Sequence, residues 1–298
     1  MEVENRQMLE SMNLRDGRML AYSEFGDPAG APVVFFHGWM ASRLVRHPDD
    51  SLTRSLGVRL ITVDRPGVGQ SSAFPDTTFA SFAGDVEALA NHLLLDRFAV
   101  FGHSGGGPFA LACAGRLPTR VIRAAVASGF APFDRPDPYE GMTNRMRSYV
   151  RLMHRAPWLA GPMLRGVPRR FRKDPEKAFA KQFSPLCEAD ERALAEPAAH
   201  ALVLESAVQA LAPGSAGVAS ESKLLFVKPW GFSLADITCP VDLWYGDADS
   251  LVPPEMGRYL ASAIPNGDIT VLPGEGHMMF ITHWADILRR LTAQTGPE

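Results

Sequence analysis

The chain has 298 residues, of which 46% are hydrophobic and 21% charged, and its formal net charge is −3. This composition excludes a disordered chain and gives no reason to expect nucleic-acid binding. The three cysteines are far apart and form no CxxC pair, so we expect neither a disulfide framework nor a zinc site. The polar N-terminus MEVENRQMLE lacks the pattern of a secretory signal, and no apolar run is long enough to cross a membrane. We therefore expect a cytoplasmic protein without a membrane span.

The first predicted element is a β-hairpin, because Asp16-Gly17 lies between two apolar-containing runs and favours a tight turn. Apolar residues recur every three or four positions between residues 79 and 93, which predicts an amphipathic helix. Between such helical patterns lie short apolar runs of the kind that form strands buried on both faces. Their alternation with helices predicts a mainly parallel sheet covered by helices on both faces. The runs are 33–36 (VVFF), 59–63 (RLITV), 98–101 (FAVF), 124–128 (AAVAS), 241–245 (VDLWY) and 269–272 (ITVL).

The alternation of strands and helices stops over residues 133–232. This segment is rich in Pro, Arg, Met and Ala, contains no clear strand, and has several helical stretches such as EKAFAKQF. Alternation resumes at residue 241. An inserted helical cap explains this order better than two consecutive domains do. We therefore expect an α/β core formed by residues 1–132 and 233–298, with a helical cap over residues 133–232.

The most informative turn is FGHSGGGPF, which surrounds Ser104 with glycine. It follows a predicted strand, precedes a predicted helix, and contains the GxSxG pattern of a nucleophile elbow. Such a turn holds the serine in a strained backbone conformation, and small residues at positions 102 and 106 allow strand and helix to approach closely. The Gly105 amide at the helix start can stabilise a developing oxyanion.

A nucleophilic serine requires a base, and the base requires an orienting acid. Downstream, GDADS follows the strand at 241–245 and offers Asp247 and Asp249, while GEGH follows the strand at 269–272 and offers His277. Both lie just beyond the carboxyl ends of strands, where sites form in parallel sheets. Asp134, beyond the strand at 124–128, is a substitute candidate for the acid.

Several segments together resemble the α/β-hydrolase superfamily, over nearly the whole chain outside the cap. They are FFHGW, DRPGVGQSS, GHSGGGPFALA, YGDADSLVPP and GEGHMMF, and they occur in the order typical of that family. The chain is most similar to bacterial hydrolases with a DRPGxGxS loop and a GHSGGGPxALA elbow. The resemblance implies an α/β-hydrolase fold in which Ser104, Asp249 and His277 form a catalytic triad. The spacing G-x-x-D favours Asp249 over Asp247 as the acid.

The resemblance also implies an oxyanion hole formed by the backbone amides of Trp39 and Gly105. Many of the similar hydrolases have a small residue and Pro-Gly after HG, whereas Trp39-Met40-Ala41 follow it here, so a bulky ring is expected near the acyl site. His37, Trp39, His103 and Met278 are candidate substrate-pocket residues. For His37, positioning of the loop is the favoured role, and for His103 it is packing or a pocket wall.

These residues predict a serine hydrolase that cleaves small to medium-sized carboxylic esters or lactones through an acyl-enzyme. No cofactor is required, and no residue cluster suggests a metal site. The same triad also serves amidases, thioesterases, C–C hydrolases and cofactor-free haloperoxidases, and a non-catalytic ligand-binding receptor is the alternative from another class. The expected partner is the small-molecule substrate, and the oligomeric state stays open.

The first half of the predicted cap is basic, and its positive residues alternate with methionine, leucine and tryptophan. A solvated face over a packed cap is the favoured interpretation. The alternatives are an electrostatic funnel for anionic substrates and a lid that contacts a membrane surface. The basic residues are Arg145, Arg147, Arg151, Arg155, Arg165, Arg169, Arg170, Arg172 and Lys173.

Overall fold

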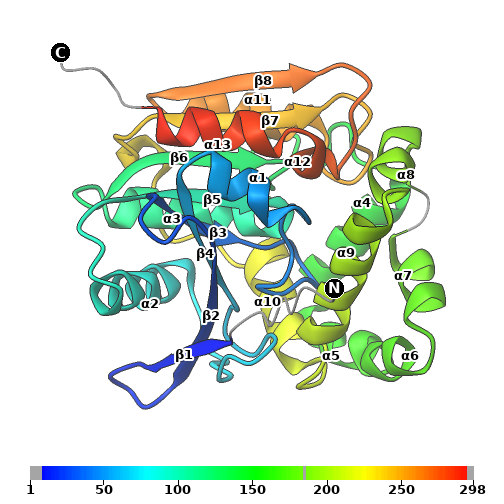
Figure 1. Ribbon diagram of the computed structural model, residues 1–298. Helices are drawn as coiled ribbons and strands as arrows, with labels where there is room; N and C mark the ends of the chain where they lie inside the picture. Colours follow the sequence, from blue (N-terminus) through cyan, green and yellow to red (C-terminus); the bar gives the residue numbers. More distant parts are fainter. Residues whose placement is uncertain (1–8, 184–185, 294–298) are drawn as a thin grey trace.

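The computed structural model describes residues 9–183 and 186–293 (Figure 1). The prediction that the chain has no secretory signal depends mainly on residues 1–8, which lie outside the described part. The chain begins with the predicted hairpin of β1 (Glu10–Asn13) and β2 (Met19–Gly26). Gly17 in its turn has φ +83°, a left-handed conformation that glycine adopts without steric cost. The hairpin prediction is confirmed.

All six predicted strands are present, and they form one eight-stranded sheet with the hairpin. The order is β1-β2-β4-β3-β5-β6-β7-β8, with β1 and β2 antiparallel and the remaining strands parallel. Every residue of β5 and β7 is buried, as expected for strands covered on both faces. The parallel strands are β3 (Ala31–Phe36), β4 (Val58–Val63), β5 (Phe98–His103), β6 (Val121–Ala127), β7 (Val241–Gly246) and β8 (Gly267–Leu272).

Helices cover both faces of the sheet, and Figure 1 shows α1 and α13 in front of it and α11 behind it. On one face α1 (Asp50–Ser55) contacts α13 (Trp284–Thr292). The opposite layer contains α3 (Gly107–Arg116) and α11 (Pro254–Ala263), which both contact η3 (Leu234–Asp236). The predicted amphipathic helix is α2 (Phe79–His92), which packs on α3, and the short α12 (Met279–Thr282) precedes α13. Among the described helices, none combines the length and the apolar character needed to cross a membrane.

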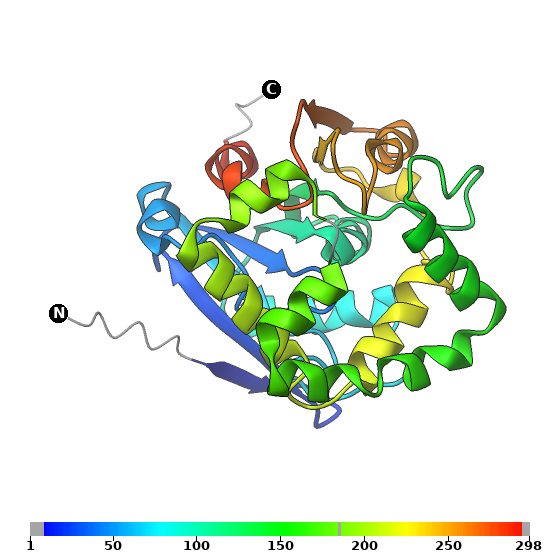
Figure 2. The same cartoon turned by 90° about the vertical axis from the view of Figure 1, so that its right-hand side faces the viewer.

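Between β6 and β7, the described residues form helices and contain no strand. Figure 1 shows this segment beyond the arrowheads of β7 and β8, which places it at the carboxyl ends of the strands, and Figure 2 shows its helices wrapping around that end. We refer to it as the α4–α10 segment. It comprises α4 (Asn144–Arg155), η2 (Pro157–Leu159), α5 (Ala160–Leu164), α6 (Val167–Lys173), α7 (Pro175–Phe183), α8 (Glu188–Leu194), α9 (Pro197–Ala210) and α10 (Ala216–Phe226).

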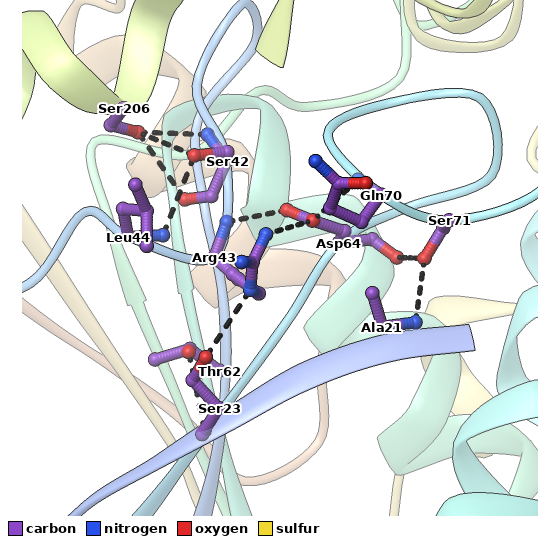
Figure 3. A network of polar contacts seen from close by, with 10 residues as sticks. All are labelled: Ala21, Ser23, Ser42, Arg43, Leu44, Thr62, Asp64, Gln70, Ser71 and Ser206. Atoms are coloured by element: carbon purple, nitrogen blue, oxygen red, sulfur yellow. Dashed lines mark hydrogen bonds and ion pairs between the residues drawn. The ribbon is translucent and has the colours of Figure 1, made fainter. Parts of the chain in front are cut away.

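A buried polar network joins the loops after β3 and β4 to β2 and α9 (Figure 3). The Asp64 carboxylate accepts hydrogen bonds from the Arg43 amide at 2.7 Å, the Arg43 guanidinium at 2.6 Å and the Gln70 amide at 2.9 Å. Next to it, the Ser42 amide donates to the Ser206 hydroxyl of α9 at 2.8 Å. Because buried polar groups are costly to leave without partners, this network fixes the loop after β3 to both the sheet and the α4–α10 segment.

Candidate active site

Ser104 lies where β5 ends and η1 (Ser104–Gly106) begins, and its backbone φ is +53°. A non-glycine residue adopts this conformation at a cost of about 1–3 kcal/mol, so the surroundings must enforce it. A Cβ on Gly102 would collide with the Gly106 carbonyl, and a Cβ on Gly106 would collide with the Phe36 carbonyl of β3. The two glycines thus allow β5, the turn and β3 to approach closely, and Ser104 is the side chain that this turn presents.

The predicted base and acid form a buried pair. His277 Nδ1 lies 2.8 Å from Asp249 Oδ2, and both side chains are almost fully buried. The other carboxylate oxygen of Asp249 accepts from the amides of Leu251 and Val252, each at 2.9 Å. These backbone donors orient the carboxylate, and the carboxylate in turn makes Nδ1 the protonated nitrogen of the imidazole. Nε2 is then the nitrogen available for proton transfer.

The other two candidate acids lie elsewhere. Asp247 is exposed and accepts a hydrogen bond from the Gly274 amide at 2.7 Å, so it links two loops rather than reaching the imidazole. Asp134 is also exposed, in the chain between β6 and α4. Of the three carboxylates considered from the sequence, the structure brings only Asp249 to His277.

Burial and charge act on His277 in opposite directions. Burial lowers the pKa of its imidazole, but the charge and hydrogen bond of Asp249, together with the charge of Asp190, outweigh burial. The pKa of His277 is therefore raised above its ordinary value of 6.5. This environment stabilises an imidazolium, the state that the base reaches after taking a proton.

His103, the neighbour of Ser104, packs on the base instead of acting as a second one. Its ring centroid lies 4.9 Å from that of His277 and 4.0 Å from that of Phe280. Its Nε2–H donates to the His277 backbone carbonyl at 3.0 Å. Burial, followed by the charge of His277, holds the pKa of His103 well below 6.5. His103 is therefore a neutral hydrogen-bond donor that also lines the cavity at Ser104.

The two predicted oxyanion donors lie side by side. A Cβ on Gly105 would lie 2.9 Å from the Trp39 backbone nitrogen, and a Cβ on Gly38 would lie 3.3 Å from the Ser104 Cβ. Within the described chain, the Trp39 amide donates to no acceptor. Gly105 belongs to the first turn of a helix, whose amides have no partner within the helix. Two backbone donors thus lie next to the serine side chain.

His37 does not line the cavity, in contrast to its prediction as a pocket residue. It is completely buried, and its Nδ1–H donates to the Gly38 carbonyl at 2.9 Å. Arg65 holds the same loop by donating to the His37 carbonyl at 2.5 Å and the Gly38 carbonyl at 3.0 Å. Its guanidinium also pairs with the carboxylate of Glu221 in α10 at 2.5 Å. Burial raises the pKa of Glu221, and the charge of Arg65 offsets this effect only in part.

Sequence reasoning did not assign Arg65, Glu221 or Asp190 to the site. Arg65 belongs to the DRPGVGQSS segment. The family resemblance of that segment predicts a loop but no particular contact for Arg65. Glu221 and Asp190 lie on helices of the α4–α10 segment, and Asp190 accepts a hydrogen bond from the Met278 amide at 2.7 Å. A sequence signal that could have identified them is an acidic residue on the apolar face of a helix. Asp190, for example, shares the buried face of α8 with Ala189 and Ala193.

Ser104 and His277 both open into one cavity of about 590 Å³ between the sheet and the α4–α10 segment. Trp39, His103 and Met278 line it as predicted. The Trp39 ring leans toward α4 and α10, with its centroid 5.7 Å from those of Tyr149 and Phe226. The remaining apolar lining comes mostly from the α4–α10 segment and includes Met146, Leu152, Met163, Leu164, Val167, Phe179, Phe183, Val203 and Ala207.

Comparison with known proteins places this geometry in context. The family model described as alpha/beta hydrolase fold matches residues 31–283. A non-heme chloroperoxidase from Streptomyces lividans is 38% identical over 120 residues, or 39% of this chain and 43% of that protein. A pimeloyl-[acyl-carrier protein] methyl ester esterase from Neisseria meningitidis is 29% identical over 258 residues, or 84% of this chain and 88% of that protein. For several curated relatives, including a proline iminopeptidase from Xanthomonas citri, the match spans less than half of the relative's length.

Solved structures resemble the chain over almost its whole length. An esterase from Rhodococcus sp. ECU1013 superposes with a TM-score of 0.72 at 21% identity, covering 97% of this chain and 99% of the other. A bromoperoxidase from Bacillus anthracis gives a TM-score of 0.71 at 22% identity, with coverage of 95% and 98%. At such identities the likeness establishes the fold. Since the family match also spans most of the sequence, the chain belongs to the alpha/beta hydrolase fold family.

Proposed function

We propose that this protein is a serine hydrolase that cleaves small to medium-sized carboxylic esters or lactones through an acyl-enzyme on Ser104. The observation that carries the proposal is the buried His277–Asp249 pair, joined at 2.8 Å, which shares a cavity with a serine held at φ +53°. A strained serine that shares a cavity with a histidine oriented by a carboxylate is the combination that nucleophilic catalysis uses.

In the proposed reaction, Ser104 Oγ attacks the substrate carbonyl carbon while His277 Nε2 takes the hydroxyl proton. Asp249 keeps the imidazole in the required tautomer and stabilises the imidazolium. The amides of Trp39 and Gly105 bind the oxyanion of the tetrahedral intermediate. Its collapse breaks the bond to the leaving alkoxide, which receives the proton from His277. Water, activated by the same histidine, then hydrolyses the acyl-enzyme and releases the acid and free Ser104.

The proposal extends to the α4–α10 segment, which we assign as a cap over residues 133–232 on a core of residues 1–132 and 233–298. The cap supplies most of the apolar wall of the 590 Å³ cavity, a volume that suits a small to medium-sized organic substrate. Methionines in that wall, such as Met146 and Met163, adapt to different shapes and favour some substrate breadth. The names of the similar proteins, which include esterases, peroxidases and an iminopeptidase, support an enzyme of this fold family and leave the scissile bond to be tested.

A serine-directed fluorophosphonate tests the nucleophile directly. We expect it to label the wild-type protein at Ser104, as located by peptide mass spectrometry, and to leave Ser104→Ala unlabelled. Ser104→Ala should also lose about 10³-fold or more in kcat toward a p-nitrophenyl ester. Near wild-type turnover by correctly folded Ser104→Ala would contradict the proposal. Absence of labelling at Ser104 in correctly folded wild-type protein would favour the receptor alternative, whereas labelling without ester turnover would point to another scissile bond.

A substrate panel then decides the bond that is cleaved. Esters of increasing acyl length, lactones, aryl amides and aminoacyl arylamides are compared at equal concentration, together with a peroxide-dependent halogenation assay. We expect the highest kcat/KM for esters or lactones, all of it lost in Ser104→Ala. Higher kcat/KM for an amide, or halogenation as the dominant activity, would replace the ester assignment while keeping the triad.

A further inference from the structure

A carboxylate from the cap reaches the loop that carries the proposed base. Asp190 lies in α8 and is 4% exposed. Its Oδ1 accepts the backbone N–H of Met278, the residue directly after His277, at 2.7 Å. A hydrogen bond to a charged acceptor is stronger than a neutral one, and in this buried position it is shielded from water. The main chain that carries the imidazole is thus fixed to a cap helix.

The residue before His277 is adapted to the same contact. A Cβ on Gly276 would collide with the Asp190 carboxylate and with the Sγ of Cys187, the residue that precedes α8. Only glycine at position 276 lets the loop pass this close to α8. The main chain on both sides of His277 is therefore shaped around Asp190, which argues against an incidental contact.

Three titratable groups act on His277 from different elements: Asp249, His103 and Asp190. A fourth group, the thiol of Cys187, lies beside the loop that carries His277. Asp249 holds Nδ1, and His103 packs on the ring from β5 with a pKa well below 6.5, so it adds no charge near neutral pH. Burial raises the pKa of the Cys187 thiol, so it too is uncharged. The charge of Asp190 acts on His277 in the same direction as that of Asp249. Asp249 and Asp190 are thus the two carboxylates whose charge raises the pKa of the imidazole.

We propose that Asp190 is a positioning residue for the reaction: it anchors the loop of His277 to the cap and supplies a second negative charge that stabilises the imidazolium. The proposal rests on the proposed function of His277 as general base. Because α8 belongs to the cap, the base reaches its full strength only when the cap is docked on the core.

Two substitutions separate the anchor from the charge. Asp190→Asn keeps an oxygen that can accept the Met278 N–H and removes the charge, whereas Asp190→Ala removes both. Glu188→Gln is the matched control, because it removes one negative charge from the same helix at an exposed position paired with Arg192 at 2.8 Å. For each protein we would measure the imidazole titration of His277 by NMR and the pH profile of kcat/KM for an ester.

We expect Asp190→Asn to lower the pKa of His277 and to move the acid limb of kcat/KM to lower pH by the same amount. Its plateau kcat should fall several-fold, and that of Asp190→Ala roughly tenfold, because the loop also loses its anchor. Glu188→Gln should leave both measurements at their wild-type values. If Asp190→Ala does not fold, Asp190→Asn decides alone, since it is nearly isosteric.

A His277 titration and a kcat/KM profile that are the same in Asp190→Asn and wild type would overturn the proposal. Equal shifts in Glu188→Gln would also overturn it, since the effect would then come from net charge. Failure of the proposed function would give a different result, because full turnover by His277→Gln would show that His277 is not the base. The NMR titration of wild type and Asp190→Asn reports on the contact independently of turnover.

Discussion

Asp247 and Asp249 are two positions apart, yet their side chains have different partners. Asp249 is 3% exposed and divides its oxygens between His277 and two backbone amides, whereas Asp247 is exposed and accepts a hydrogen bond from the Gly274 amide. In an extended strand end, residues two positions apart point to the same side, but the chain turns here after β7. The turn, and not the residue type, selects which carboxylate meets the imidazole.

This difference predicts the ranking of two conservative variants. Asp249→Asn should lower kcat by about 10³-fold or more, because an amide neither holds the required tautomer nor stabilises the imidazolium. Asp247→Asn keeps an acceptor for the Gly274 amide and should remain within about threefold of wild type. Steady-state kinetics on both proteins, with circular dichroism to verify folding, tests the ranking. The reverse order would assign the acid to Asp247.

The raised pKa of His277 predicts the pH dependence of activity. The base must be neutral to take the serine proton, so kcat/KM should fall as the pH drops through the pKa of His277. Because Asp249 and Asp190 raise that pKa, the midpoint should lie above the ordinary 6.5 of histidine. A kcat/KM that stays constant from pH 5 to 8, in protein that remains folded, would contradict a histidine base.

At the scale of elements, the elbow depends on main-chain contacts that exclude side chains. Gly106, the last residue of η1, lies against the carbonyls of Phe36 and His37 at the carboxyl end of β3. A methyl group there must displace backbone, and a densely packed core accommodates such a shift poorly. The close approach of β3, β5 and η1 is therefore a requirement of the fold as well as of the site.

Two glycine-to-alanine variants test this interpretation. Gly106→Ala should lower the free energy of unfolding by at least ~3 kcal/mol or prevent folding, since the added Cβ meets backbone. Gly84→Ala, in the middle of α2 with open space where its Cβ would lie, should raise the free energy of unfolding by about 0.5–1 kcal/mol. Urea denaturation followed by circular dichroism measures both. A neutral Gly106→Ala would show that the elbow adjusts easily.

The helices of the α4–α10 segment combine an apolar inner wall with exposed arginines. Arg170 lies at the cavity lining but is exposed, and the adjacent Arg169 is exposed as well. The Arg169→Gln/Arg170→Gln double variant should therefore change kcat/KM for neutral esters by less than about threefold, since exposed charge is screened at ordinary salt. Kinetics at low and high salt check this. A large, salt-sensitive loss would favour the alternative of an electrostatic funnel or a membrane-surface lid.

At the scale of the whole molecule, sequence patterns predicted the strands and turns, which depend on residues close together in the chain. Apolar runs identified the six parallel strands, Asp16-Gly17 identified the hairpin, and the glycines around Ser104 identified the strained turn between β5 and α3. The contact of Asp190 with Met278 spans 88 positions and that of Arg65 with Glu221 spans 156. Such pairs depend on how the helices of the α4–α10 segment dock on the sheet, and a single sequence carries no periodicity that encodes this docking.

The order of strands in the sheet has a consequence for synthesis of the chain. β6 pairs with β7 along Ala124–Ala127, yet the entire α4–α10 segment is translated between them. Until residue 241 leaves the ribosome, β6 has an apolar, unpaired edge, the kind of edge that promotes aggregation of a nascent chain. The same delay means that Ser104 emerges long before Asp249 and His277. A partly made chain therefore carries the proposed nucleophile without its proposed base, and under the proposed mechanism it cannot react until the last two strands have joined the sheet.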